Sequence, residues 1–110
     1  MNIDARQEGT QLVLAPHGAI DSTTVKELDA ALQAKIAGGA SRVVLDLTAV
    51  PFLDSSGIGI IVRFHRALKE KSGELVVAGS CDAVLKVFKL IRLHQYLKIV
   101  PTVAEALTPA

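Results

Sequence analysis

Apolar and polar positions divide the chain into short extended runs and longer stretches with helical spacing. Residues 3–8 and 11–15 are extended runs separated by Gly9-Thr10, a spacing that predicts an antiparallel hairpin. Residues 22–37 carry apolar side chains at every third or fourth position and end at Gly38-Gly39, which predicts an amphipathic helix. The polar run 21–24 marks the start of this helix, but the sequence leaves open which of its hydroxyl groups is the N-cap.

The second half of the chain alternates between strand and helix. Residues 42–47 form an apolar run interrupted by Asp46, as expected for a parallel strand covered on both faces. Residues 56–71 show helical spacing, with an inner stripe of Ile58, Ile61, Val62, His65 and Leu68. A strand at 75–78, a helix at 82–91 with Ile91 facing inward, a strand at 98–100 and a brief helix ending before Pro109 complete the prediction.

This order of elements predicts an α/β fold. We expect a single domain over residues 1–110, in which helices pack against a mixed, mostly parallel β-sheet. A chain of 110 residues that is 50% hydrophobic can bury a core without a metal or a disulfide. Loops at the carboxyl ends of parallel strands gather at one sheet edge, so the turn at Asp21 is expected near the turn at Asp54.

Composition and charge narrow the function. The 12 Lys and Arg residues nearly balance the 11 Asp and Glu residues, which argues against direct binding to nucleic acid or to an anionic membrane. The single cysteine, Cys81, is expected to be buried and cannot form an internal disulfide; with no apolar leader or membrane span, we expect a cytoplasmic protein. His17, His65 and His94 are scattered singly and no phosphate-binding glycine motif is present, so neither metal nor cofactor is expected.

Asp54-Ser55-Ser56-Gly57 stands where a buried strand gives way to a helix. The first turn of a helix has unpaired N–H groups and a partial positive charge, so a phosphate on Ser55 or Ser56 would lie in a favourable field. Plain helix capping is the simpler interpretation, because Asp and Ser are favoured N-cap residues. One cap needs only one such residue, however, and the surplus favours a docking or modification site.

A serine at a strand-to-helix turn is also found in the nucleophile elbow of hydrolases. That motif places glycine two positions before the serine, whereas Asp54 and Leu53 stand two positions before Ser56 and Ser55. None of the three histidines lies in a context that marks it as a general base. We therefore expect no catalytic residues and no enzymatic activity.

The stretch 43–59, VVLDLTAVPFLDSSGIG, resembles the signature of STAS domains, most of all that of bacterial anti-sigma factor antagonists. The Gly18-Ala19-Ile20-Asp21 turn and the strand after Gly73 fall where that family has their counterparts. The resemblance implies that Ser56 is the phosphorylated residue. It also implies a surface for partner binding formed by Asp21, Asp54, Ser55, Ser56 and Gly57.

The resemblance further implies partner switching. The unphosphorylated protein would bind an anti-sigma factor that is also a serine kinase, and a PP2C-type phosphatase would reverse the phosphorylation that ends this binding. An alternative is a STAS subunit of another assembly, such as a lipid-transport ATPase or a stressosome. There the same face would be a fixed contact and would need no phosphate.

Overall fold

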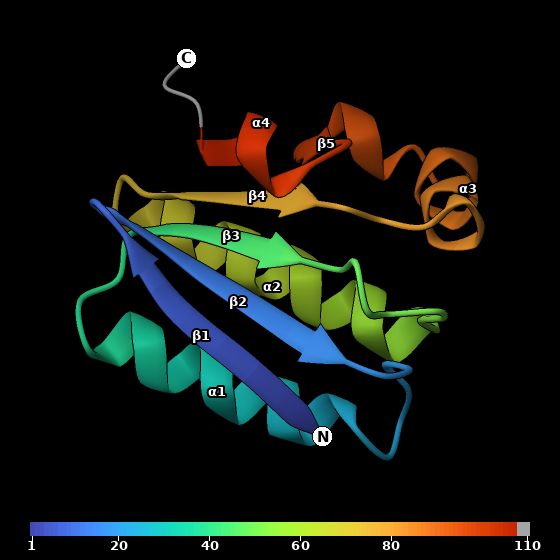
Figure 1. Ribbon diagram of the computed structural model, residues 1–110, viewed down its shortest axis with the longest axis horizontal. Coiled ribbons are helices and arrows are strands. Elements are labelled where there is room, and N and C mark those ends of the chain that lie inside the picture. The colour runs from blue at the N-terminus through green and yellow to red at the C-terminus, as the bar shows by residue number, and fades with distance from the viewer. Residues whose placement is uncertain (108–110) are drawn as a thin grey trace.

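The structure, a computed structural model, describes residues 1–107 and contains one five-stranded sheet in the order β1-β2-β3-β4-β5 (Figure 1). The hairpin of β1 (Asn2–Glu8) and β2 (Gln11–His17) is antiparallel and turns through Gly9 at φ 63°. The strands β3 (Arg42–Asp46), β4 (Glu74–Ala78) and β5 (Lys98–Val100) follow in parallel. The predicted mixed, mostly parallel sheet is confirmed.

Helices cover both faces of this sheet. The larger core lies between the sheet and α1 (Val25–Ala37), α2 (Ser55–Glu70) and α3 (Asp82–Leu90), where Leu28, Ile61 and Phe88 are buried. A smaller core on the other face joins Val13, Val44 and Val76 to Ala106 of α4 (Val103–Leu107). Alternate residues of β3 therefore enter different cores, and the predicted burial of this strand on both faces is confirmed.

The strands β2, β3 and β4 run in one direction, so the loops that leave them lie along one edge of the sheet (Figure 1). We call this the carboxyl edge; it is formed by residues 17–24, 47–54 and 79–81. The opposite, amino edge contains the starts of β3, β4 and β5 and the 3₁₀ turn η1 (Leu93–Gln95). The Asp54-Ser55-Ser56 motif lies at the carboxyl edge, where the loop after β3 leads into α2.

Several local predictions are wrong in detail. The helix predicted from residue 22 begins at Val25, because residues 21–24 form a turn of their own. The buried stripe of α2 is made mainly by Ile60, Ile61, Phe64 and Leu68, so Ile58 and Val62 are only half-buried.

Two further predictions fail near α3. Ile91 is 49% exposed rather than inward-facing, because α3 ends at Leu90 and Arg92 turns the chain through a left-handed conformation at φ 58°. Cys81 is half-buried rather than buried. The predicted end of the last helix, before Pro109, lies outside the described residues.

Candidate functional site

Asp54 is the N-cap of α2. Its Oδ1 accepts hydrogen bonds from the backbone N–H groups of Ser56 at 2.9 Å and Gly57 at 3.3 Å, and from the Ser56 hydroxyl at 2.5 Å. These hydrogen bonds, with that of the Ser56 hydroxyl as the largest contribution, lower the pKa of Asp54 below 3.8. Asp54 alone caps the helix, and neither serine hydroxyl accepts a capping hydrogen bond.

The two serines differ in their surroundings. Ser55 is exposed at the first position of the helix, whereas Ser56 is half-buried with its hydroxyl held against Asp54. A phosphate on Ser56 would remove this hydroxyl donor and place a dianion beside the Asp54 carboxylate. The unpaired N–H groups of the first helical turn would offset part of the repulsion.

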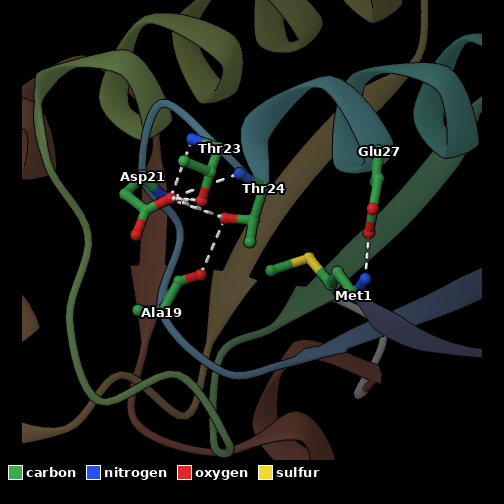
Figure 2. A network of polar contacts seen from close by, with 6 residues as sticks. All are labelled: Met1, Ala19, Asp21, Thr23, Thr24 and Glu27. Carbon is green, nitrogen blue, oxygen red and sulfur yellow. Dashed lines mark hydrogen bonds and ion pairs between the residues drawn. The ribbon is translucent and has the colours of Figure 1, made fainter.

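Asp21 organises the neighbouring loop in the same manner (Figure 2). Its Oδ1 accepts from the backbone N–H of Thr23 at 2.9 Å, from the Thr23 hydroxyl at 2.6 Å and from the Thr24 N–H at 3.2 Å. The Thr23 hydroxyl makes the largest contribution to lowering the pKa of Asp21. Both aspartates are therefore ionised carboxylates whose charge is satisfied largely within their own loops.

The hydroxyl of Thr24 ties the start of α1 to this turn: it donates to the Ala19 carbonyl at 2.8 Å and accepts from the Asp21 N–H at 3.0 Å (Figure 2). The sequence alone leaves open which hydroxyl group is the N-cap of α1, and the structure places Thr24 there without a side-chain capping bond. Glu27, in the first turn of α1, pairs with the Met1 ammonium (Figure 2). An Asp followed by Thr two and three positions later is the signal for such a turn.

A short parallel bridge between Ile20 and Leu53 joins the two loops. The Ile20 N–H donates to the Phe52 carbonyl at 2.9 Å, and the Asp54 N–H donates to the Ile20 carbonyl at 3.1 Å. Asp21 is close enough for its charge to affect the Asp54 carboxylate, since it raises the pKa of Asp54 against the overall lowering by hydrogen bonds. The expected proximity of the two turns is confirmed.

Gly57 permits this close approach. A Cβ atom at this position would lie 2.9 Å from Cγ2 of Ile20 and 3.4 Å from Cβ of Leu53. A Cβ atom on Gly59, two residues further along α2, would face open space. All five residues expected at the partner surface thus lie on the two loops joined by the bridge and on the first turn of α2. Their role in binding stays a prediction.

The other candidates take no part in the contacts of Asp21 and Asp54. His17 is exposed and contacts Asp4 at 2.8 Å, His94 is exposed, and His65 is buried on α2. Asp46, which interrupts its strand, accepts hydrogen bonds from the N–H and the hydroxyl of Thr48.

Within residues 1–107, no group of three or more His, Cys, Asp or Glu side chains is arranged to hold a metal ion. No helix in the same range is long and apolar enough to cross a membrane.

The comparisons with known proteins agree with this fold and motif. A model of the STAS domain family matches residues 2–106, so the chain belongs to that family. The relatives include anti-sigma-B factor antagonists of Listeria monocytogenes, 29% identical over 74% of this chain and 72% of the relative, and of Staphylococcus aureus, 25% identical over 90% and 92%. Anti-sigma factor antagonists are regulatory proteins rather than enzymes, in agreement with the expectation for this chain.

A solved structure leads to the same group of proteins. The crystal structure of an anti-sigma factor antagonist from Mycobacterium paratuberculosis superimposes with a TM-score of 0.89 at 27% identity, covering 96% of this chain and 90% of that one. The single α/β domain predicted from the sequence is therefore the STAS fold, and its similarity to anti-sigma factor antagonists extends over most of the chain.

Proposed function

We propose that this protein is an anti-sigma factor antagonist that works by partner switching in the cytoplasm. Unphosphorylated, it binds an anti-sigma factor that is also a serine kinase, and so frees the sigma factor. Phosphorylation of Ser56 ends the binding, and a PP2C-type phosphatase restores it. The chain needs no cofactor and no catalytic group of its own for this role.

The observation that carries the proposal is the position of the Ser56 hydroxyl, held on the Asp54 carboxylate at the start of α2. Phosphorylation adds a charge of about −1.5 to −2 there, next to two ionised aspartates. A dianion enclosed in a protein contact without matching cations costs several kcal/mol, enough to dissolve an interface of ordinary affinity. The helix N-terminus accommodates the same charge in the free protein, so the fold survives the modification.

Phosphate transfer to single-site variants tests the proposal. The kinase of the same organism, given ATP, should add one phosphate to the wild type and to Ser55→Ala, and none to Ser56→Ala. Intact-mass analysis followed by peptide mapping measures the transfer. Equal labelling of Ser56→Ala and the wild type would contradict the assignment. Co-purification with a membrane ATPase, without labelling at Ser56, would instead favour a fixed subunit of another assembly.

A further inference from the structure

Phe52 is the exposed aromatic side chain of the carboxyl edge. It is 55% exposed, whereas the next residue, Leu53, is 2% exposed and belongs to the main core. Apolar surface is costly to leave in water, and aromatic residues, Phe among them, are enriched at protein interfaces relative to the rest of the surface. The loop between β3 and α2 thus turns its largest apolar side chain outward, two residues before the cap of the helix that carries Ser56.

Hydrogen bonds hold Phe52 in this outward position. Its carbonyl accepts from the Ile20 N–H at 2.9 Å, which fixes the loop against the neighbouring turn. On the other side, the Cys81 thiol lies 3.7 Å from the Val50 carbonyl and 3.8 Å from the Pro51 carbonyl. Turning the ring inward would break this bridge and displace Leu53 from the core. The backbone that carries the ring is thus fixed before binding, so a partner that covers the ring does not have to order the loop.

The charges around Phe52 favour an apolar contact over an electrostatic one. The segments 17–24, 47–54 and 79–82 contain Asp21, Asp54 and Asp82 but no lysine or arginine. Asp21 and Asp54 already accept hydrogen bonds from their own loops, so they need no cation from a partner. A partner that placed cations over Ser56 would bind the phosphorylated form more tightly, which is the opposite of the proposed switch.

We propose that Phe52 is the apolar anchor of the partner contact and inserts into an apolar recess of the anti-sigma factor, whose surface over Ser56 lacks lysine and arginine. This inference rests on the proposed function and adds the source of the affinity that phosphorylation overcomes. Phe52 supplies attraction in both states of the protein. The phosphate on Ser56 prevents the partner from closing over it.

Affinity measurements with the purified anti-sigma factor kinase of the same organism test the anchor. Phe52→Ala should weaken the unphosphorylated complex by about 30-fold, as expected for the loss of a central aromatic anchor. The matched control is Leu90→Ala at the end of α3, where the side chain is 75% exposed; its affinity should stay within about twofold of the wild type. Both side chains are exposed, so the thermal midpoint of each variant should match that of the wild type.

A fluorescent reporter tests where the ring goes. The chain contains no tryptophan, so Phe52→Trp introduces a single indole on this protein. Its emission should shift to shorter wavelength when the kinase is added, whereas Leu90→Trp should not respond. The affinity of the wild type should also change less than about threefold between about 50 mM and about 500 mM NaCl, since salt screens charges and not apolar burial.

The outcomes separate this inference from the proposed function. If Ser56→Asp weakens the complex while Phe52→Ala binds like the wild type, the anchor is wrong and the switch stands. If Phe52→Ala weakens the complex while Ser56→Asp does not, the anchor stands and the proposed switch fails. A strong loss of affinity with salt would overturn the apolar contact, and a wild type that does not bind the kinase would overturn both proposals.

Discussion

The two edges of the sheet have opposite character. The carboxyl edge carries Asp21 and Asp54 on loops that are joined by backbone hydrogen bonds, with Phe52 exposed between them. The amino edge contains a cavity of about 580 Å³ that is lined by His65 and Tyr96, by Lys69 and Lys98, and by the ion pair of Arg42 and Glu74. The net charge of +1 conceals this separation. This cavity is not lined by residues of the serine motif, whose loops are suited to contact with a protein surface.

Helix dipoles explain part of the separation. Asp54 and Asp82 lie at the N-terminal ends of α2 and α3, and Lys69 and Lys89 lie in the last turns of the same helices. Each such charge stabilises its helix by about 0.3–1 kcal/mol. Because crossover helices run opposite to the strands, their N-termini all meet at the carboxyl edge. The acidic residues of this edge therefore stabilise the helices, and a phosphate on Ser56 would add further negative charge beside them.

The largest expected effect is on the affinity for the anti-sigma factor kinase, when a negative charge is introduced at one edge of the sheet or at the other. Ser56→Asp should weaken binding to the anti-sigma factor kinase by about 100-fold, or about 2.8 kcal/mol, because it places a carboxylate in the contact beside Asp54. Ser72→Asp adds the same charge at the amino edge, where Ser72 has φ 59°, a conformation that Asp tolerates, and should bind like the wild type. Titration calorimetry measures both. Equal weakening would show that the edges are not distinct.

Glycine substitutions compare how tightly the two edges are packed. At the amino edge, a Cβ on Gly73 would lie 2.1 Å from the Ser41 carbonyl oxygen, so Gly73→Ala forces backbone to move and should lower the free energy of unfolding by about 3 kcal/mol. At the carboxyl edge, a Cβ on Gly57 would lie 2.9 Å from Cγ2 of the buried Ile20, a longer distance and a side-chain contact; the helix propensity of Ala offsets part of this overpacking, and the net loss should be about 1 kcal/mol.

Gly59→Ala is the control for these two substitutions. Its Cβ would face open space on the same helix as Gly57, so the variant should gain about 0.5–1 kcal/mol from helix propensity alone. Urea denaturation of the three variants measures the order. If Gly57→Ala were as stable as Gly59→Ala, close packing of α2 against the Ile20 loop would not be what this glycine provides.

Much of this arrangement could be predicted from the sequence. The apolar run of β3 and the spacing of α2 gave the strand-to-helix junction to within one residue, and the rule for parallel strands placed Asp21 near Asp54. The outward position of Phe52 could not be predicted, because the apolar segment Val50-Pro51-Phe52-Leu53 favours burial throughout. The bridge to Ile20 decides which of these side chains faces the core, and a contact between distant segments leaves no local signal.

The smallest expected effect concerns His65, at the amino edge. The residue is 7% exposed, its ring makes an edge-type contact with the ring of Tyr96, and its Nδ1 has no hydrogen-bond partner within residues 1–107. Burial, followed by repulsion from Lys69 and Arg66, lowers the pKa of His65 below 6.5. The unfolded chain therefore takes up a proton at higher pH than the folded protein does.

The neutral, buried form of His65 therefore contributes fully to the free energy of unfolding above pH 6.5. This contribution is lost as the pH falls from 6.5 through the lower pKa of the folded protein. His65→Leu removes the titrating group, so the free energy of unfolding should fall less steeply between pH 7.5 and pH 5.5 than it does in the wild type. If the free energy of unfolding fell with equal slope in His65→Leu and in the wild type, burial of the His65 ring would not be a cause of the loss of stability at low pH.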